Sequence, residues 1–389
     1  MNIIKFEKTK RKIKLKIFGI TVFEEKFNED ETSSKTKYFM GLLHTRLKGS
    51  CKLWYFLFFP IWIKNVNKQF LHSFLNEVIG KYPDYEDYYV FLSRSGEFFL
   101  LMHHFREWMH KNKSKNCILV FTAKYHLNIC KMFFPEIPTA YIKRVNVPLV
   151  SRGVPSISFK YKDKNIYVPT NEKYFVDVEN KIRSNNAHYY ELLKEHLNLS
   201  DNITNYSIKE KTKDKIEKIV KYILNDNFVI ISPETLSNEP IEKDFWENLT
   251  TELKNHGFEV FCNSMNFNNL VSNSTSTFLT YEESIELSKY AKAIIGMRSG
   301  FLECLSQNNV PLFALYTDFP KRFGFKRLAS DKVLSGYSIK KLPNVNTDLL
   351  FEYDVNKYKN DEDIIPDILS KINEYGIKSA NAEREYKWR

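Results

Sequence analysis

The sequence predicts an α/β protein with two parallel-sheet domains that face a cleft. Two observations predict it. Apolar runs of the length of buried strands alternate with segments of helical spacing in two parts of the chain, and in each part a small-residue turn joins a strand to a helix. The 389 residues leave room for two ordinary domains, and 43% hydrophobic with 15% aromatic residues excludes a disordered chain.

Residues 1–70 are expected to form a basic and aromatic N-terminal extension. The chain carries a net charge of +11, and much of the excess lies near its start. The basic residues there are Lys5, Lys8, Lys10, Arg11, Lys12, Lys14 and Lys16. A basic end suits an anionic membrane surface, and a solvated lysine-rich face is the alternative. No nucleic-acid-binding motif with interleaved aromatic residues follows, so nucleic acid is not an expected partner.

Three stretches of this extension have a predicted structure. Residues 13–23 alternate around Gly19 and predict a small hairpin, and residues 27–38 are polar and predict a loop. Residues 51–64, CKLWYFLFFPIWIK, are too short for a transmembrane helix, which needs roughly 20 apolar residues. Their tryptophans and flanking lysines are typical of an element lying on a bilayer, and a core or interdomain segment is the alternative. Pro60 disfavours a simple amphipathic helix.

The cysteines bear on the compartment. The five are scattered, odd in number and without a CxxC pair: Cys51, Cys117, Cys130, Cys262 and Cys304. We expect reduced thiols in a cytosolic protein, without a disulfide or metal framework. The N-terminus lacks an apolar core after its charges, so no secretory signal is expected. The expected location is the cytoplasm, peripheral on the inner face of the cytoplasmic membrane if the extension touches lipid.

The first α/β domain is expected over residues 71–165. Its predicted strands are residues 88–92, 117–121 and 139–142, and its predicted helices are residues 98–109 and 127–134. The turn between the first strand and the first helix is Ser93-Arg94-Ser95-Gly96-Glu97. Residues 166–225 are polar, with helical patches at 190–196 and 214–224, and are expected to be a linker or crossover.

The second α/β domain is expected over residues 226–360. Its predicted strands are residues 228–231, 258–262, 293–297 and 311–316. One helix is predicted to end at 255–257, and Thr280 to Glu283 has the spacing of a capping box. Arg298-Ser299-Gly300 interrupts the apolar pattern, as a strand-to-helix turn does. Residues 361–389 are expected to be an amphipathic helix and a charged tail.

This plan resembles the GT-B glycosyltransferase architecture, in which two Rossmann-like domains face a cleft. Two parts of the sequence carry the resemblance. Residues 232–263 and 280–320 look like the donor domain of the heptosyltransferase family, and Ser93 to Leu101, SRSGEFFLL, is similar to the Ser-x-x-Gly-Asp turn of its acceptor domain. The family's donor turn reads Asp-x-Gly-x-x-His, whereas Met297 to Glu303 reads MRSGFLE. This turn is closer to those of bacterial surface-polysaccharide transferases of lipopolysaccharide and capsule biosynthesis, so the donor sugar is left open.

The donor site can be argued from chemistry. A departing diphosphate needs backbone N–H groups and a cation, since no DxD motif stands in a convincing place for a metal. Ser299, Gly300 and Phe301 are expected to supply the N–H groups, and Arg298 a guanidinium fork. Glu303 is a candidate for the ribose hydroxyls, with compensation of the helix dipole as the alternative. The residues expected to line the rest of the nucleotide pocket are Ser232, Thr235, Asn263 and Lys243.

The acceptor side is expected at the first domain's turn. Glu97 is the candidate catalytic base, and the resemblance implies the same, since the matching family position holds a catalytic acidic residue. Helix-dipole compensation is again the alternative. The other residues expected on this side are Arg94, Ser95, Gly96, His103 and His104. The two histidines are weaker candidates for the base, because a histidine in a helix is more often structural.

The expected function is therefore that of a glycosyltransferase of the hexosyl- or heptosyltransferase type. It would use a nucleoside-diphosphate sugar as co-substrate, a glycan or glycolipid as acceptor, and neither a cofactor nor a metal. Two alternatives remain open. One is another cell-wall polymer transferase on the same frame, such as a pyruvyl or glycerol-phosphate transferase, and the other is a non-catalytic binding protein that lost the Asp and His of the donor motif.

Overall fold

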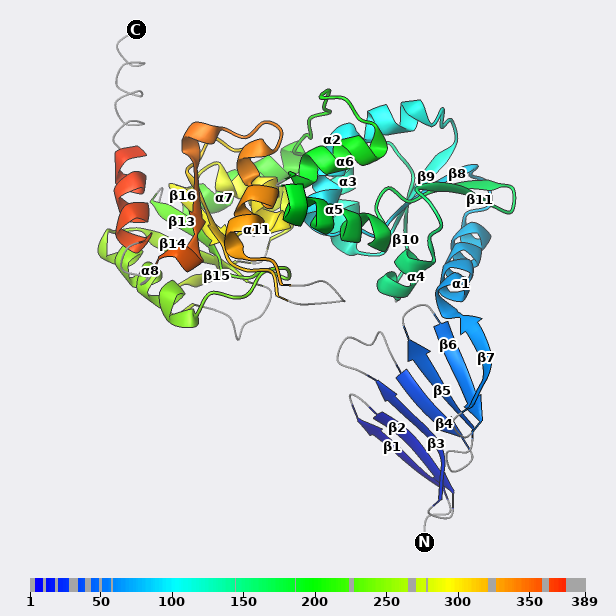
Figure 1. Cartoon of the computed structure of the whole chain (residues 1–389). Helices are drawn as coiled ribbons and strands as arrows, with labels where there is room; N and C mark the ends of the chain where they lie inside the picture. The colour runs from blue at the N-terminus through cyan, green and yellow to red at the C-terminus, as the bar shows by residue number, and fades with distance from the viewer. Residues whose placement is uncertain are drawn as a thin grey trace. The chain divides into compact units, whose positions relative to one another are not determined.

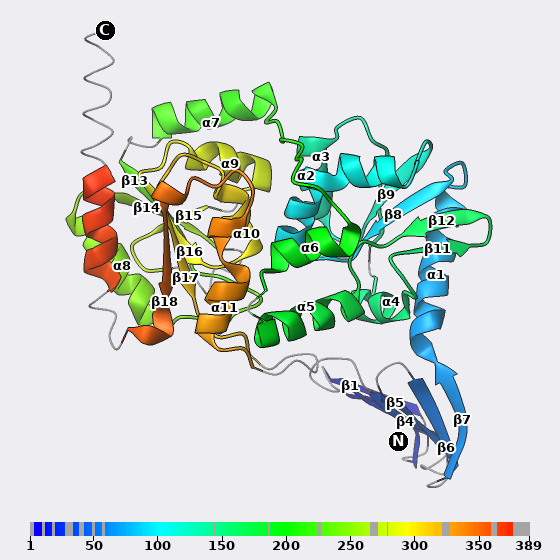
Figure 2. The same cartoon turned by 45° about the horizontal axis from the view of Figure 1, so that its top comes forward.

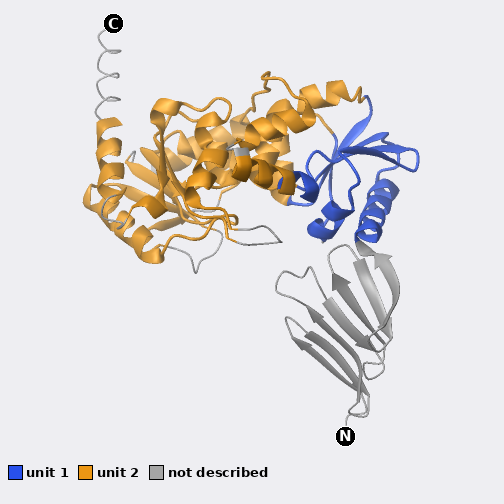
Figure 3. Cartoon of the chain, viewed as in Figure 1, with its two compact units in different colours: residues 1–92, 115–123, 138–175 blue, residues 93–114, 124–137, 176–389 orange. Residues whose placement is uncertain are grey.

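The computed structural model describes both backbone and side chains for most of the chain after residue 66 (Figure 1). These residues are 67–143, 145–184, 187–221, 227–264, 271–276, 279–320, 327–358 and 364–375; for seven N-terminal strands and a few element ends only the backbone is described. The chain divides into two compact units, coloured in Figure 3. Unit 1 holds residues 1–92, 115–123 and 138–175, and unit 2 holds residues 93–114, 124–137 and 176–389. The expected domain limits stay predictions.

The N-terminal strands form an antiparallel sheet in which each strand pairs with the next. They are β1 (Ile4–Thr9), β2 (Lys12–Ile17), β3 (Ile20–Phe27), β4 (Ser34–Tyr38), β5 (Leu43–Lys48), β6 (Cys51–Phe56) and β7 (Phe59–Asn65). The predicted hairpin is confirmed by the pairing of β2 with β3. The predicted loop over residues 27–38 is wrong at its end, where β4 pairs with β3 and β5. The sequence of β4, SKTKY, lacks the apolar alternation that reveals a strand.

The aromatic segment 51–64 falls in β6 and β7. These strands pair antiparallel, with an irregular register where Tyr55 faces Pro60. The side chains of this segment, and those of the basic residues before it, lie outside the described residues. Contact with lipid stays a prediction.

Unit 1 also contains a five-stranded sheet with the order β10-β9-β8-β12-β11. Its strands are β8 (Asp87–Phe91), β9 (Cys117–Phe121), β10 (Thr139–Tyr141), β11 (Ser158–Tyr161) and β12 (Lys164–Tyr167). All neighbours are parallel except β11 and β12. The predicted strands are confirmed. The β11–β12 hairpin was not predicted, because its two strands are short and Lys162 rather than glycine adopts the positive φ of 57° in its turn.

Helices α1 (Val66–Lys81) and α4 (Val147–Gly153) belong to the core of unit 1. Leu75 and Val78 of α1 and Val150 of α4 are buried with Tyr88, Ile118 and Ile166 of the sheet. Arg152 pairs with Glu172 at 2.7 Å and ties α4 to the start of α5 (Glu172–Asn185). Most of the stability of unit 1 comes from this burial of apolar surface.

Unit 2 contains a six-stranded parallel sheet with the order β15-β14-β13-β16-β17-β18. Its strands are β13 (Phe228–Ser232), β14 (Glu259–Asn263), β15 (Thr275–Thr277), β16 (Ala293–Met297), β17 (Leu312–Tyr316) and β18 (Leu350–Asp354). This is the order of a doubly wound Rossmann sheet. The predicted strands are confirmed, and β15 and β18, which lie at the two edges of the sheet, were not predicted. The α/β class with two parallel sheets is confirmed.

Unit 2 holds most of the helices. They are α2 (Ser95–Lys111), α3 (Lys124–Phe133), α6 (Tyr189–Leu197), α7 (Glu210–Ile223), α8 (Lys243–Asn255), α9 (Tyr281–Ser288), α10 (Gly300–Leu305), α11 (Ser330–Tyr337) and helical residues 364–375. The short 3-10 helices are η3 (Ile339–Lys341), η4 (Thr347–Leu349) and η5 (Val355–Lys357). The helical patches expected in the linker are confirmed as α6 and α7, and the C-terminal amphipathic helix as residues 364–375.

Local signals explain where these helices begin and end. Thr280 and Glu283 form the predicted capping box of α9, with Glu283 accepting from the Thr280 N–H at 2.9 Å. Helix α8 ends at the predicted point, and Gly257 takes the positive φ of 80° that follows many helices. Figures 1 and 2 both show α8 beside helical residues 364–375, and the two bury Leu249, Leu253 and Ile368 on one face of the unit 2 sheet. The polar loop after β13 and the turn after β16 lie at the carboxyl ends of the strands.

Candidate functional site

The strand order of the unit 2 sheet reverses between β13 and β16. From β13 the chain runs to one edge through β14 and β15, then returns to β16 and continues to the other edge. In open parallel sheets the loops after two such strands diverge, and ligands bind in the crevice at their carboxyl ends. The loop after β13 is residues 233–242, and the turn after β16 is Arg298-Ser299. We therefore take the carboxyl ends of β13 and β16 as the candidate site. The residues that form it belong to unit 2.

Two turns with the same sequence, Arg-Ser-Gly, meet at this site. One opens α2 and the other opens α10. A Cβ atom built on Gly300 would lie 2.4 Å from the Gly96 nitrogen and 2.5 Å from Ser95 Oγ. A Cβ atom on Gly96 would lie 1.9 Å from Glu303 Oε2. Only glycine permits this approach, so the two turns depend on each other's missing side chain.

The guanidinium of Arg298 is enclosed. Its side chain lies beside the rings of Tyr189 and Tyr337, which contact each other, with Cζ 5.2 Å and 4.8 Å from their centroids. It is ion-paired with Glu303 Oε1, which also accepts from the Tyr189 hydroxyl at 2.7 Å. Burial lowers the pKa of Arg298, but the Glu303 carboxylate, together with Tyr189, Tyr316 and Glu97, more than offsets this and raises it overall. Among the described residues, its Nε has no hydrogen-bond partner.

This pair bears on two expected roles. Arg298 is 5% exposed and Glu303 is 1% exposed, so neither faces solvent. A phosphate fork from Arg298, or a ribose contact from Glu303, would require the pair to open. Both roles stay predictions.

The residues expected to supply N–H groups are also engaged. Ser299 is the N-cap of α10, and its Oγ accepts from the Leu302 N–H at 3.4 Å. Gly300 is covered by the turn of α2. The ring of Phe301 lies 6.0 Å from that of Tyr281. The predicted strand-to-helix turn is confirmed, but the close approach at Gly300 is to the turn of α2, and the ligand of this turn stays a prediction.

The turn that opens α2 is more accessible. Arg94 is exposed, and its Nη1 donates a hydrogen bond to Ser237 Oγ. Ser95 and Glu97 are half-buried, whereas Gly96 is buried. Burial raises the pKa of Tyr125, and the Glu97 carboxylate raises it further. Glu97 follows Gly96, the residue that meets Gly300 of the other turn, and its role as a base stays a prediction.

Both candidate histidines are buried in α2. His103 Nδ1 bonds the Thr204 carbonyl at 2.9 Å, and its Nε2 accepts from the side-chain amide of Gln307 at 2.8 Å. Burial lowers the pKa of His103 to about 4. His104 bonds the Asn202 carbonyl at 3.1 Å and the Tyr190 hydroxyl at 2.6 Å, and burial lowers its pKa too. With both nitrogens of each ring engaged, the two are held as neutral structural groups.

The remaining expected residues are spread along the strand ends. Ser232 is 2% exposed at the end of β13, and Asn263 is half-buried at the end of β14. Thr235 Oγ1 donates to the Arg298 carbonyl at 3.3 Å and accepts from the Ser237 N–H at 3.2 Å. Lys243 is exposed at the start of α8 and pairs with Glu247 at 3.1 Å. Of these, Thr235 alone is bonded directly to the Arg298 turn in the described structure.

Sequence reasoning missed Tyr189, Tyr337 and Ser237. Tyr189 lies in the stretch interpreted as a linker, and Tyr337 follows the expected strands. No local pattern announces that these rings enclose an arginine, because the contact arises only from the tertiary fold. Ser237 is a polar loop residue two positions after Thr235, and the sequence gives no sign that it pairs with Arg94.

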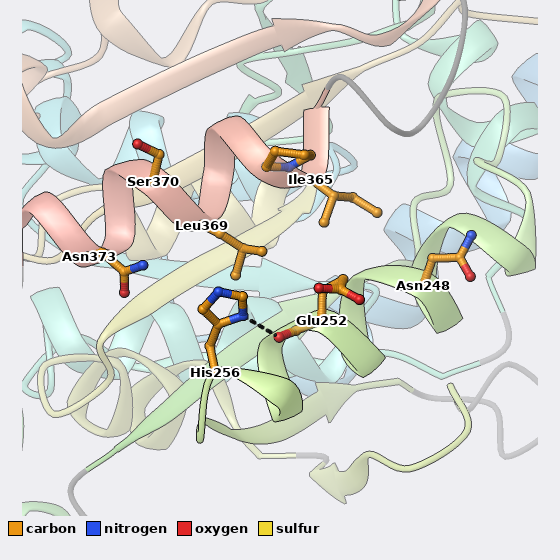
Figure 4. A pocket seen from close by; sticks show the side chains of 8 residues that line it. Asn248, Glu252, His256, Ile365, Leu369, Ser370 and Asn373 are labelled. Atoms are coloured by element: carbon orange, nitrogen blue, oxygen red, sulfur yellow. Dashed lines mark hydrogen bonds between the residues drawn. The ribbon is translucent and has the colours of Figure 1, made fainter.

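A separate cavity of about 570 Å³ lies between α8 and residues 364–375 (Figure 4). Glu252 and His256 line one wall and Ile365 and Leu369 the other, and His256 Nδ1 bonds the Glu252 carbonyl at 2.8 Å. His256 precedes β14, so this cavity lies toward the amino ends of the strands. It contains none of the candidate site residues.

The described part of the chain lacks a metal-binding cluster and a membrane-spanning helix. In those residues, no group of three or more His, Cys, Asp or Glu side chains is arranged to hold a metal ion. None of the helices that the structure describes has both the length and the apolar character to span a bilayer.

The chain is similar in structure to GT-B glycosyltransferases, notably heptosyltransferases. A family 9 glycosyl transferase from Veillonella parvula DSM 2008 aligns with a TM-score of 0.45 and 11% identity over 75% of this chain and 98% of that one. E. coli ADP-heptose LPS heptosyltransferase II gives 0.44 and 12% over 75% and 99%. E. coli heptosyltransferase WaaC with ADP gives 0.41 and 7% over 74% and 99%. No protein-family model and no curated protein matches the sequence. Similarity at this level concerns the fold and does not extend to the reaction.

Proposed function

We propose that this protein is a glycosyltransferase that moves a sugar from a nucleoside-diphosphate sugar to a lipid-linked or cell-surface glycan. One observation carries the proposal: two Arg-Ser-Gly turns meet where the strand order reverses between β13 and β16. This is the position at which open parallel sheets bind nucleotides. The pathway we propose is lipopolysaccharide- or capsule-type biosynthesis on the inner face of the cytoplasmic membrane.

The proposed reaction needs no metal. The acceptor hydroxyl loses its proton to the Glu97 carboxylate as its oxygen bonds the anomeric carbon of the donor sugar. The bond from that carbon to the diphosphate oxygen breaks, and the nucleoside diphosphate leaves with the electron pair. Backbone N–H groups and an arginine at the turns stabilise its charge.

A thermal-shift screen with ADP, GDP, UDP, CMP and their sugars tests the binding step. A ligand that binds only the folded state raises the apparent melting temperature, so one base should give a clear shift. With that donor, Glu97→Gln should lower turnover about a hundredfold or more and leave donor binding within about twofold. Unchanged turnover in this variant would remove Glu97 from the proposal. No shift with any nucleotide, in a folded sample, would remove the donor.

A non-catalytic binding protein is a second candidate, and a specific observation favours it. The Arg298 charge is neutralised by Glu303, and Gly300 is covered by Gly96, so the donor turn is closed in the described structure. Binding without turnover, together with no effect of Glu97→Gln, would support this candidate.

A further inference from the structure

The two arginines at the candidate site differ in whether their charge is paired with a carboxylate. Arg298 is buried beside two tyrosine rings and paired with Glu303. Withdrawing it toward a ligand would leave the Glu303 carboxylate buried without its cation, which is strongly unfavourable. Arg298 is therefore poorly suited to pair with a group that arrives and departs in each reaction cycle.

Arg94 has the opposite properties. It is the N-cap of α2, where the N–H of Phe98 donates to its carbonyl at 3.0 Å, so its backbone is fixed. Its side chain is exposed, and the partner of Nη1 is the neutral hydroxyl of Ser237. A phosphate oxygen that replaced this hydroxyl would add a negative charge opposite the guanidinium, and a phosphate can accept two parallel bonds from its fork. Exchange at Arg94 therefore leaves no buried charge behind.

The position of Arg94 is also suitable. Ser237 belongs to the loop after β13, and its N–H donates to Thr235 Oγ1, which in turn donates to the carbonyl of Arg298 after β16. The Arg94 guanidinium thus reaches the point where the strand order reverses. Its charge also lowers the pKa of Tyr125 and of Tyr337, although burial raises both overall.

From these contacts we propose that Arg94 is the residue that pairs with the donor diphosphate, while Arg298 serves as a buried support for the turn. The inference rests on the proposed function and reassigns its cation. Arg94 exchanges Ser237 Oγ for the phosphate oxygens when the nucleotide binds, and returns to Ser237 when the diphosphate leaves. Arg298 and Glu303 stay paired throughout.

The test compares ADP, GDP and UDP with adenosine, guanosine and uridine on the whole chain, by calorimetry or thermal shift. A phosphate-binding cation should affect only the diphosphates. Arg94→Ala should weaken the binding of the preferred diphosphate about tenfold to a hundredfold and leave the matching nucleoside unchanged. Arg94→Lys should recover part of the loss, because it keeps the charge without the planar fork.

Arg106→Ala is the matched control. Arg106 is an exposed arginine on the same helix, 3.4 Å from Glu136, and its removal should change neither affinity. If the wild type binds a diphosphate and Arg94→Ala binds it equally well, the inference about Arg94 is overturned and the proposed function stands. If the wild type binds no diphosphate, the proposed function falls and the inference with it. Equal losses for diphosphate and nucleoside would also overturn it, since that result indicates a general disturbance of the site.

Discussion

Arg94 and Arg298 each precede Ser-Gly at a strand-to-helix turn, yet the first is exposed and the second is 5% exposed. The helices also begin at different points of the shared tripeptide. Arg94 is the N-cap of α2, whereas Ser299 is the N-cap of α10. That offset of one residue accompanies two different environments, one arginine at the surface and one buried beside two tyrosine rings.

The difference teaches that a tripeptide does not define a site. Arg298 is enclosed because Tyr189, Tyr337 and Glu303 surround it, and none of these belongs to the tripeptide. Arg94 meets a loop serine instead. Whether an arginine supports a fold or binds a ligand is decided by the partners that the tertiary structure brings to it.

Breaking the buried ion pair between Arg298 and Glu303 should have the largest effect on stability. Glu303→Ala leaves the Arg298 guanidinium buried without a counter-charge, and should lower the free energy of unfolding by about 3–5 kcal/mol. Urea unfolding at neutral pH measures it. Glu136→Ala, which removes the exposed partner of Arg106, is the matched control and should cost no more than about 1 kcal/mol. Equal costs for the two variants would contradict the enclosure of Arg298. Replacing both partners, as Arg298→Met with Glu303→Leu, should recover much of the loss.

Acid should loosen α2 from the segment that follows α10, because His103 of α2 accepts a hydrogen bond from Gln307 in that segment. Burial lowers the pKa of His103 from its ordinary value of 6.5 to about 4, so the unfolded chain binds this proton more readily than the folded one. The stability that neutral His103 contributes is present above pH 6.5 and is lost as the pH falls toward 4, by about 3 kcal/mol.

His103→Gln tests this dependence on pH. The variant should lose less stability than the wild type between pH 6.5 and 4.5 in urea titrations, although it starts less stable. His110→Gln, an exposed histidine of the same helix, is the matched control for replacing a histidine. The other buried histidines add to the wild-type slope, and burial lowers the pKa of both His126 and His188 to about 3, so the comparison is between variants. An unchanged slope in His103→Gln would contradict the assignment.

The glycine contact should give a smaller effect. Gly300→Ala places a Cβ atom against the backbone of Gly96, and should destabilise the protein by about 1–3 kcal/mol. Gly80→Ala is the control, because a Cβ atom there meets nothing within 4 Å in the described structure and alanine favours the helix. It should stabilise by up to about 1 kcal/mol. If both variants unfold alike, the turns are not in contact.

The sequence predicts those parts of the fold that carry a local signal. The strands β8, β9, β13, β14, β16 and β17 are apolar runs, and Thr280 and Glu283 have the spacing of a cap. Among the strands it misses, β4 and β15 are polar and lack an alternation that separates a strand from a loop, and β11 alternates over only 4 residues. Both turns of the candidate site also follow from local sequence, since a glycine after a buried strand indicates a strand-to-helix turn.

The environment of each site residue could not be predicted in the same way. His103 and His104 are neighbours on one helix, and both are buried because residues 202–204, Tyr190 and Gln307 meet them from distant parts of the chain. Tyr189 reaches Glu303 from 114 residues away. Such contacts depend on how complete elements pack, and a sequence pattern within one element contains no information about them.

The pairing of α2 with α10 has a consequence for synthesis of the chain. Gln307 and His103 are 204 residues apart, and the two glycines are equally far apart. At ~5–20 residues per second, α2 leaves the ribosome about 10 to 40 s before its partner. During that interval the turn that contacts Gly96 and the Gln307 amide that donates a hydrogen bond to His103 have not yet been synthesised. The nascent chain therefore presents a half-covered helix to chaperones and proteases, and translation beyond residue 307 sets the earliest moment at which the candidate site can close.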